Sequence, residues 1–341
     1  MKAFVKHGTQ PGQVAVTEVS RPAPGPGEVL IKVSGCGICG SDLHAFNNDP
    51  GYEFVTPPVI LGHEFSGVVV ETGPGVDPGK VGDHVTAVAI QGCLKCPTCL
   101  AGGSHLCPDR QVIGLHFDGA MAGFVVTKAD QLLSLPSNLD LNLAPLVEPV
   151  SVALHALRRT VIRPGDKVVV SGPGPIGLLC AGLAKLHGAR VLLLGMNRDA
   201  KVRLPAAQRL GLETAIVEGE SPEELVRSTF GEGMADLFIE ASGAAPALKS
   251  GFNLVRRGGT ILIVALYNSE LTWFPSPSVR NELSILLSYA STRPDYEQAI
   301  NLMANQAMDF SVLAQHFPLE KAEEAFREAL GGQLLKPVLV V

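Results

Sequence analysis

The stretch DKVVVSGPGPIGLLCAGLAKLHGARVLLLG, residues 166–195, decides the expected fold of the central part of the chain. A run of valines leads into the pattern Gly-x-Gly-x-x-Gly, and a second expected strand, RVLLL, begins 13 residues after Gly177. Such patterns occur by chance, but a strand before and a helix after them are the context in which they bind dinucleotides. Gly172 allows a tight turn, Gly174 lets the backbone approach a pyrophosphate, and Gly177 allows close packing of helix on strand. We therefore predict a dinucleotide site, against the alternative of an ordinary glycine turn.

The predicted helix opens at Pro175 and Ile176, so its free N–H groups and the positive end of its dipole would face the phosphates. Apolar runs alternate with helical patterns from about Leu146 to GGTILIVAL at 258–266. This alternation predicts an α/β domain with a parallel sheet and right-handed crossovers. In contrast, the chain before about residue 140 holds short valine-, glycine- and proline-rich runs broken by turn signals, which predict a β-rich domain.

Length and composition limit the class of protein. A chain of 341 residues exceeds what one hydrophobic core usually supports, and 46% of its residues are hydrophobic, so we expect two globular domains. The net charge of −6 and isoelectric point near 5.9 disfavour nucleic acid and anionic membranes as partners, since both require a basic surface. The first residues lack the apolar core of a signal peptide, and no run approaches the roughly 18 apolar residues of a membrane span. We expect a cytoplasmic protein that binds small molecules.

Four of the seven cysteines lie in GCLKCPTCLAGGSHLC, residues 92–107. In a reducing compartment clustered thiols bind metal more often than they form disulfides, and such short loops suit disulfide geometry poorly. An iron–sulfur cluster of the bacterial ferredoxin type would have three residues between its last two cysteines, and here there are seven. We therefore favour zinc held by four thiolates, a closed structural site with no position for substrate. The predicted ligands are Cys93, Cys96, Cys99 and Cys107.

The end of the second strand bears on the choice of dinucleotide. NAD sites usually place Asp or Glu there to bind the ribose hydroxyls, and this chain has Gly195. Without that carboxylate nothing repels a 2′-phosphate, and Arg198, Lys201 or Arg203 could pair with one. We favour NADP over NAD. The alternatives are that Asp199 reaches an NAD ribose, or that the basic residues form a solvated helix face.

Three further segments hold metal-ligand residue types, and each is ordinary when taken singly. They are CGICGSDLH (Cys36–His44), GHE (Gly62–Glu64) and LVEPVSVALHA (Leu146–Ala156). In this order, with the four-cysteine segment, the glycine pattern and EASG at 240–243, the chain closely resembles the zinc-dependent medium-chain dehydrogenase/reductase family, particularly its sorbitol (polyol) dehydrogenase branch. The resemblance covers essentially the whole chain.

The resemblance implies a domain organisation. A GroES-like β-rich catalytic domain would contain residues 1–149 and 289–341 and carry the structural zinc lobe. A Rossmann domain with a doubly wound parallel sheet would contain residues 150–288 and bind NAD(P). The expected fold class is therefore α/β.

The resemblance also implies a catalytic zinc, so that the chain would hold two zinc ions. Its ligands would be Cys39, His63 and Glu148, with Glu64 either binding directly or exchanging with water. In the alcohol dehydrogenase branch a cysteine occupies the position of Glu148, so this carboxylate favours the polyol branch. A mixed set of thiolate, imidazole and carboxylate leaves one coordination position open for substrate.

The family's chemistry implies roles for further residues. Zinc would act as a Lewis acid on a substrate hydroxyl, and a hydride would pass to the nicotinamide ring. Ser41 and His44 match the family's proton relay from substrate oxygen to solvent, and the alternative for His44 is an ordinary surface histidine. Lys336 matches a basic position that contacts the pyrophosphate in relatives.

The implied substrate is a secondary alcohol or polyol and its ketone. Phe46, Tyr52 and Phe117 are candidates for the pocket wall, with plain core positions as the alternative. Related polyol enzymes carry an arginine where this chain has Ser288, which argues against sorbitol itself. Two other functions stay open: a threonine-type, amino-sugar or cyclitol dehydrogenase on the same scaffold, and a non-catalytic nucleotide-binding protein. Family members are commonly dimers or tetramers, so we expect a homo-oligomer.

Overall fold

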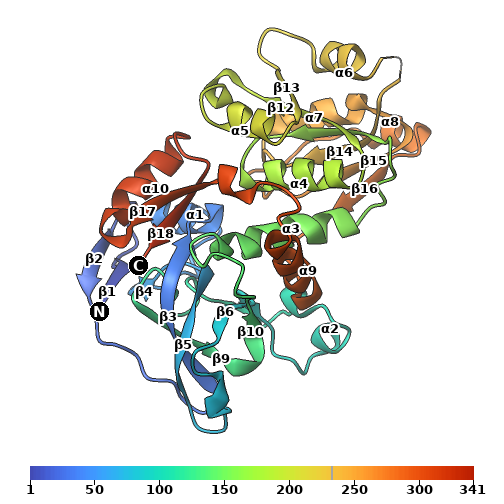
Figure 1. The fold of residues 1–341 in the computed structure, drawn as a ribbon. Helices are drawn as coiled ribbons and strands as arrows, with labels where there is room; N and C mark the ends of the chain where they lie inside the picture. Colours follow the sequence, from blue (N-terminus) through green and yellow to red (C-terminus); the bar gives the residue numbers. More distant parts are fainter. Residues whose placement is uncertain (232) are drawn as a thin grey trace. The chain divides into compact units, whose positions relative to one another are not determined.

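The computed structural model describes residues 1–231 and 233–341, which form two compact units (Figure 1). Unit 1 contains Met1–Ser151 and Thr292–Val341, and unit 2 contains Val152–Ser291. The chain passes from unit 1 to unit 2 after residue 151 and back after residue 291, and the boundaries expected from the sequence are residues 149 and 288. The chain leaves unit 1 and returns to it, so both termini belong to the same unit.

Unit 2 is built on a parallel sheet of six strands in the order β13-β12-β11-β14-β15-β16. Counted from the first strand of the unit, this is the order 3-2-1-4-5-6 of the doubly wound dinucleotide-binding fold. Val168, Val169 and Val170 are fully buried, as expected for a central strand that is covered on both faces. The strands are β11 (Lys167–Ser171), β12 (Arg190–Gly195), β13 (Glu213–Ile216), β14 (Ala235–Glu240), β15 (Val255–Ile263) and β16 (Ser284–Leu287).

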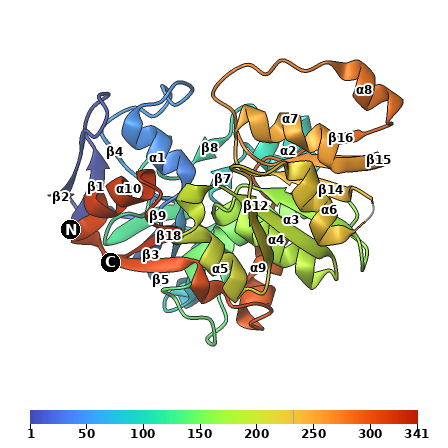
Figure 2. The ribbon, with the colours of Figure 1, turned by 90° about the horizontal axis from the view of Figure 1, so that it is seen from above.

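Helices cover this sheet, with α4 on β11 and β12 and α7 on β14 and β15 (Figure 1). The middle of α4 is buried without interruption from Gly177 to Ala184, because nearly all of its residues are apolar. Figure 2 shows α8 standing away from the sheet on the long connection that follows β15. The helices are α4 (Pro175–Leu186), α5 (Arg203–Arg209), α6 (Pro222–Phe230), α7 (Ala245–Leu254) and α8 (Pro275–Arg280), with a 3₁₀ turn η5 (Asn197–Asp199).

Unit 1 is rich in strands, as its valine-, glycine- and proline-rich sequence predicts. Its largest sheet has the order β10-β6-β5-β3-β18-β17, and β9 also pairs with β3. The long strand β3 is central because β5, β9 and β18 all pair with it antiparallel. Smaller sheets have the orders β2-β1-β4 and β7-β8. The strands are β1 (Lys2–Lys6), β2 (Val14–Glu18), β3 (Glu28–Gly37), β4 (Val59–Ile60), β5 (Glu64–Thr72), β6 (His84–Ala87), β7 (Ile90–Gln91), β8 (Gln111–Val112), β9 (Phe124–Lys128), β10 (Leu132–Ser134), β17 (Ala314–Pro318) and β18 (Lys336–Val340).

The core of unit 1 joins residues of its sheets with residues of the helices α1 and α10. Phe326 of α10 packs against Phe4 and Phe46, with ring centroids 4.9 and 5.4 Å apart. Phe46 is 3% exposed, so this proposed pocket-wall residue lies in the core. The helices are α1 (Gly40–Asn47), α2 (Pro97–Leu100), α9 (Arg293–Ala304) and α10 (Ala322–Leu330), while α3 (Val147–Arg158) begins in unit 1 and continues into unit 2. Six 3₁₀ turns complete it: η1 (Pro78–Lys80), η2 (Ser104–Leu106), η3 (Ala129–Gln131), η4 (Ala144–Leu146), η6 (Phe310–Val312) and η7 (Leu319–Lys321).

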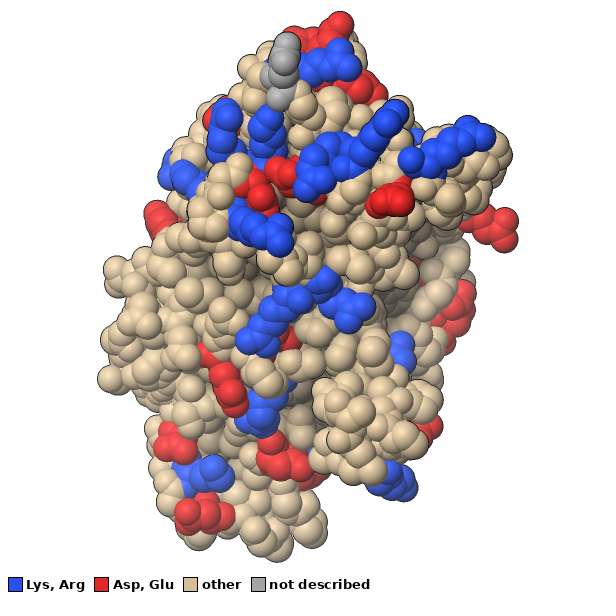
Figure 3. Space-filling view, turned by 90° about the vertical axis from the view of Figure 1, so that its right-hand side faces the viewer, with Lys and Arg blue, Asp and Glu red and all other residues tan. Residues whose placement is uncertain are grey.

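Charged side chains of both signs lie next to one another on the face drawn in Figure 3. This mixture agrees with the small net charge of −6. Within residues 1–231 and 233–341, no helix combines the length and the apolar character needed to cross a bilayer.

Candidate active site and metal centres

The start of helix α1 brings the first predicted ligand into place. Cys39 is the residue immediately before the helix. Asp42 accepts a hydrogen bond from the Cys39 N–H at 2.9 Å and so caps the helix. The same carboxylate accepts from the N–H of Gly62 at 3.3 Å, in the segment that carries the next two predicted ligands. One fully buried carboxylate therefore joins the two ligand-bearing segments.

His63 and Glu64 follow a glycine that tolerates no side chain. Gly62 has φ +99°, and a Cβ there would lie 2.6 Å from the Cys36 sulfur. Glu64 begins β5 and is the register partner of Gly37 in β3. A Cβ on Gly37 would lie 2.2 Å from a carboxylate oxygen of Glu64. Gly37 thus provides the space that the Glu64 carboxylate occupies.

Three of the predicted catalytic-zinc ligands converge. The ligand atoms of Cys39, His63 and Glu64 all lie within 4.8 Å of one another. Asp42 lies 3.7 Å from His63 Nδ1, so Nε2 is the nitrogen that remains for a metal, and the Ser41 Oγ lies 3.4 Å from it. Oε2 of Glu64 is buried and has no hydrogen-bond partner among the described residues. A buried set of thiolate, imidazole and carboxylate with an unpaired oxygen fits a zinc ion.

Lys336, which the resemblance places at the pyrophosphate, is buried beside this cluster. Its ammonium donates to Glu64 Oε1 at 2.5 Å and to the Ile38 carbonyl at 3.0 Å. Only 3% of the lysine and 1% of the glutamate are exposed. Burial alone would lower the pKa of Lys336, but the Glu64 carboxylate and the Cys39 thiol outweigh it and raise the pKa. Lys336 therefore holds one oxygen of Glu64 and leaves the other for a metal.

Glu148 lies near the start of α3 and is 9% exposed. Burial, followed by the neighbouring Glu64 carboxylate, raises the pKa of Glu148 to about 7. Glu148 is outside the group of three whose ligand atoms lie within 4.8 Å. The neighbouring Glu64 carboxylate disfavours ionisation of Glu148, and a bound divalent cation would favour the ionised form of both carboxylates.

The four cysteines of residues 92–107 form a second cluster, with all four sulfurs within 4.8 Å of one another. The Cys96 N–H donates to the Cys93 sulfur and the Cys99 N–H to the Cys96 sulfur, each at 3.4 Å. The N–H groups of Lys95 and Cys96 lower the pKa of Cys93 to about 6, because such donors favour the thiolate. All seven cysteines of the chain are free thiols. This cluster fits a closed four-thiolate zinc site.

The glycine pattern forms the turn between β11 and α4. Gly172 has φ +100°, and a Cβ there would lie 2.7 Å from the Ser242 backbone. A Cβ on Gly177 would lie 1.9 Å from the Gly172 carbonyl oxygen, so this glycine lets the helix approach the strand. Gly174 is the N-cap of the helix that begins at Pro175, and the side of its Cα where a side chain would stand faces open space. That open side is where a pyrophosphate could meet the N–H groups of the helix.

The residues at and just after the end of β12 differ in how much space surrounds them. A Cβ on Gly195 would lie 2.9 Å from the side chain of Leu204. Asp199 is 3% exposed and accepts hydrogen bonds from a backbone N–H at 2.9 Å and from Arg203 at 3.2 Å. Asp199 and Arg203 therefore already partner each other, while Arg198 is exposed.

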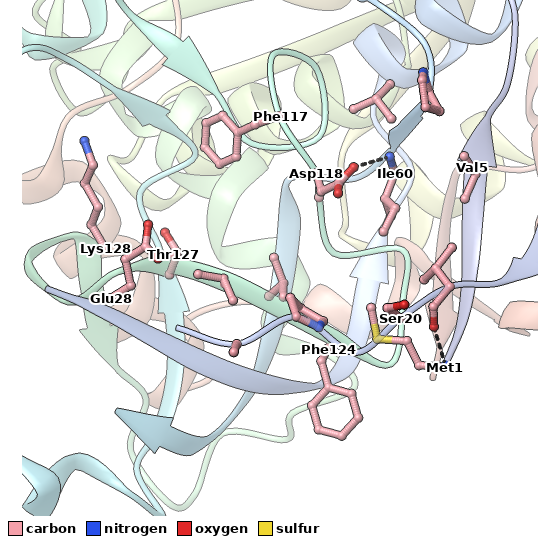
Figure 4. Close-up of a pocket in the computed structure, with 18 of the residues that line it drawn as sticks. Met1, Val5, Ser20, Glu28, Ile60, Phe117, Asp118, Phe124, Thr127 and Lys128 are labelled. Atoms are coloured by element: carbon pink, nitrogen blue, oxygen red, sulfur yellow. Dashed lines mark hydrogen bonds between the residues drawn. The ribbon is translucent and has the colours of Figure 1, made fainter. Parts of the chain in front are cut away.

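The proposed relay and pocket residues lie in different environments. The His44 ring stacks on Tyr52 with ring centroids 5.0 Å apart, and the histidine side chain is 34% exposed. Phe117 lines a cavity of about 620 Å³ elsewhere in unit 1, and the described residues around that cavity include none of the predicted metal ligands (Figure 4). Tyr52 thus contacts His44, a proposed catalytic residue. Phe46 packs in the core of unit 1, and Phe117 lines the cavity described above.

Comparison with known proteins connects this geometry to a family. Two family models match the chain, Alcohol dehydrogenase GroES-like domain over residues 25–137 and Zinc-binding dehydrogenase over residues 175–305. A sorbitol dehydrogenase of Halalkalibacterium halodurans is 39% identical over 99% of this chain and 99% of its own length. The chain belongs to the zinc-dependent medium-chain dehydrogenase/reductase family. The expected resemblance is confirmed, and with it the combination of a GroES-like and a Rossmann domain.

Solved structures in the same comparison have closely similar folds. A zinc-binding dehydrogenase of Sinorhizobium meliloti 1021 bound to NADP has a TM-score of 0.90 at 31% identity, over 100% of this chain and 99% of its own. An Escherichia coli CFT073 alcohol dehydrogenase complexed with NADH has a TM-score of 0.90 at 25% identity, over 100% of this chain and 99% of its own. As a member of the family, this chain is a zinc-dependent alcohol or polyol dehydrogenase.

Two buried carboxylates of this dehydrogenase lie in segments that the sequence analysis names, but it assigns neither of them a role. Asp42 had one available signal, since Cys39-x-x-Asp42 has the spacing of a helix capping box. Glu240, at the end of β14, is fully buried and accepts from the Tyr267 hydroxyl at 2.5 Å and from the Gly243 N–H at 3.2 Å. Glu240 thereby holds the loop that follows β14, and nothing in its local sequence identifies the tyrosine as its partner.

Proposed function

We propose that this dehydrogenase oxidises a secondary alcohol of a polyol, and reduces the matching ketone, with NADP or NAD as hydride carrier. The observation that carries the proposal is the buried set Cys39, His63 and Glu64, with ligand atoms within 4.8 Å of one another. Such a mixed set leaves the open position that a catalytic zinc needs. The relative named sorbitol dehydrogenase supports a polyol as the substrate class, while Ser288 in place of an arginine disfavours sorbitol itself.

Cys39 and His63 would hold the catalytic zinc together with one carboxylate, Glu64 or Glu148, so that three protein ligands leave one position open. When bound, the zinc supplies Lewis-acid polarisation of the substrate hydroxyl, and the nicotinamide takes up the hydride. Asp42 would orient the His63 ring through Nδ1, at 3.7 Å, and so direct Nε2 to the metal. Lys336 would fix the Glu64 carboxylate through Oε1.

The substrate proton would leave through Ser41 and His44. The Ser41 Oγ lies 3.4 Å from the metal-facing nitrogen of His63, which puts this hydroxyl next to the reacting centre. Both residues lie on α1, three positions apart, and therefore on one face of the helix. His44 is partly exposed, which supports a role in passing the proton to solvent.

We assign the second metal site to a structural zinc held by Cys93, Cys96, Cys99 and Cys107. Four thiolates complete a tetrahedral shell, so this ion would take no part in the reaction. The enzyme would then carry two zinc ions in each chain. The free thiols support an intracellular, cytoplasmic location, where such a site stays reduced.

We favour NADP as the preferred cofactor. Gly195 offers no carboxylate to a ribose, and Arg198 is exposed close by. Asp199 accepts two hydrogen bonds already, which disfavours it as a ribose ligand. One observation opposes NADP, since the Glu218 carboxylate accepts a hydrogen bond from the Asn197 N–H, next to Arg198. Direct comparison of the two cofactors is therefore part of the test.

We also propose a homo-oligomer. The strand β16 forms one edge of the sheet of unit 2, and its Leu287 is 65% exposed. Trp273 and Phe274 of the same unit are 45% and 72% exposed. Unpaired sheet edges and exposed aromatic side chains are typical of surfaces that a second copy covers. Light scattering on the purified protein gives the mass that tests this.

The proposed function is tested by a screen of the zinc-loaded protein. Polyols, polyol phosphates, simple secondary alcohols and L-threonine are each offered with NAD and with NADP, and the His63→Ala variant serves as the blank. We expect turnover of at least one polyol by the wild type and none by the variant. Preference for threonine would favour the threonine-type alternative, and a two-zinc protein that oxidised no alcohol would contradict the proposal.

A further inference from the structure

His44 and Asp49 are joined twice at the end of α1. The ring Nδ1 lies 2.6 Å from Asp49 Oδ2, and the Asp49 N–H donates to the His44 carbonyl at 3.0 Å. Asn48 adopts a left-handed backbone with φ 54°, so the chain turns back after the helix and brings the carboxylate to the ring. The contact is therefore built into the way this segment ends its helix.

An aromatic side chain that stacks on the face of the His44 ring also fixes the orientation of that ring. Tyr52 stacks on the ring with centroids 5.0 Å apart and an interplanar angle of 27°. The Tyr52 N–H donates to the Asp49 carbonyl at 3.1 Å, so the carboxylate and the stacking ring belong to one hydrogen-bonded turn. The stack continues through Phe54, at 5.7 Å from Tyr52, to His116, at 4.7 Å from Phe54. His44 is held at its edge by a carboxylate and on its face by an aromatic row.

The chemistry of this contact selects one form of the imidazole. An ionised carboxylate only accepts hydrogen bonds, so the Nδ1 that faces Asp49 must carry the hydrogen. A neutral imidazole has one N–H, which leaves Nε2 with its lone pair available. We propose that Asp49 is a positioning residue that selects this tautomer and fixes the ring, so that His44 Nε2 accepts the proton released by the substrate. The origin of that proton rests on the proposed function, but the tautomer does not.

The oxidation of the alcohol balances in protons and electrons. On the proposed function, the alcohol would lose a hydride from carbon to the dinucleotide and a proton from oxygen, and that proton would pass by way of Ser41 to His44 Nε2. The imidazolium then carries hydrogen on both nitrogens, with its Nδ1–H still bonded to Asp49. Loss of the Nε2 proton to solvent restores the starting tautomer. Asp49 stays ionised throughout and exchanges no proton, as expected of a group that acts through its neighbour.

The test compares Asp49→Ala with Asp49→Glu in the zinc-loaded protein. The backbone hydrogen bonds that end α1 do not use the Asp49 side chain, so Asp49→Ala removes only the carboxylate. Asp77→Ala is the matched control, since Asp77 accepts a backbone N–H in another exposed turn of unit 1. The readout is the tautomer, observed in long-range ¹H–¹⁵N spectra of histidine-labelled protein at about pH 8.5, two units above the ordinary histidine pKa. The signal of His44 is assigned by its absence in His44→Gln.

We expect Nδ1–H, Nε2-unprotonated signals from His44 in the wild type, in Asp49→Glu and in the control, and loss of that pattern in Asp49→Ala. In turnover, Asp49→Ala should lower kcat by about 10²-fold with KM within a few-fold, since general-base catalysis contributes about 10²–10⁴-fold. Retention of the Nδ1–H tautomer in Asp49→Ala, or a kcat unchanged by it, would overturn the proposal. If no alcohol were oxidised at all, the spectra would still decide the tautomer, so the two failures are distinguishable.

Discussion

The two metal clusters of unit 1 are assembled in opposite ways. Cys93, Cys96, Cys99 and Cys107 all come from one short segment, and the backbone N–H groups of that segment bind their own sulfurs. The other cluster takes Cys39 from the start of a helix and His63 and Glu64 from the start of a strand, and its lysine lies 272 positions from Glu64. The first cluster is made by local sequence and the second by the fold.

The difference separates a structural from a catalytic role. A local set of four identical soft ligands closes the coordination shell and stabilises its own loop. A set drawn from distant segments can mix ligand types, leave a position open and be tuned by neighbours such as Asp42 and Lys336. Loss of a ligand should therefore cost mainly stability in the first cluster and mainly turnover in the second.

The largest effect is expected from Cys39→Ser or His63→Ala. Removing a ligand removes the Lewis acid, and kcat should fall at least about 10⁴-fold, since the metal contributes several kcal/mol. The protein should stay folded and bind dinucleotide, because unit 2 has its own core. Kinetics, circular dichroism and cofactor titration measure the three properties. Undiminished activity in either variant would overturn the assignment.

Cys99→Ser should reverse that pattern. The free energy of unfolding should fall by about 4 kcal/mol, because metal binding at a closed site is part of the folding free energy. Cys180→Ala is the control, since Cys180 is buried in α4 outside both clusters. Urea unfolding compares the two. A well-folded Cys99→Ser protein that lost only catalysis would show that the lobe is not purely structural.

Lys336→Met probes the buried pair at the mixed cluster. It keeps much of the side-chain volume but leaves the Glu64 carboxylate without its ammonium, which should destabilise the protein by about 3 kcal/mol. The double variant Glu64→Gln/Lys336→Met should recover part of that loss, because no uncompensated charge remains. Denaturant titration of both variants tests this. Equal stabilities of Lys336→Met and wild type would show that the pair of Lys336 with Glu64 does not stabilise the protein.

Arg198→Ala lies outside both clusters and should have the smallest effect. If Arg198 pairs with a 2′-phosphate, its loss should lower the ratio of kcat/KM for NADP over NAD about tenfold, since a charge-assisted hydrogen bond contributes roughly 1.5–3 kcal/mol. Zinc content should not change. We prefer this variant to Gly195→Asp, because a Cβ at Gly195 would meet the Leu204 side chain at 2.9 Å. A wild type that already prefers NAD by tenfold would exclude NADP.

The contrast between the clusters also explains what the sequence could predict. The four-cysteine site and the turn at Gly172–Gly177 are determined by spacing within short stretches, so residue types alone identify them. The order of the parallel sheet follows from the same regularity, since alternating strands and helices permit few arrangements.

Contacts between residues that only the three-dimensional fold brings together cannot be predicted from the sequence. Lys336 matches a family position that contacts a phosphate, and only the register of β18 and β5 on either side of β3 reveals that it binds Glu64. The bond between His44 and Asp49 depends on the left-handed turn at Asn48, which the sequence does not specify. Periodicity identifies buried faces, but it does not identify which buried charge meets which.

The most direct test of two clusters with different roles is the zinc content of each chain, measured by mass spectrometry of the metal in wild type and in Cys39→Ser/His63→Ala. We expect two zinc ions in the active wild type and one in the folded, inactive double variant. One zinc in the active wild type, or two in the double variant, would contradict that expectation.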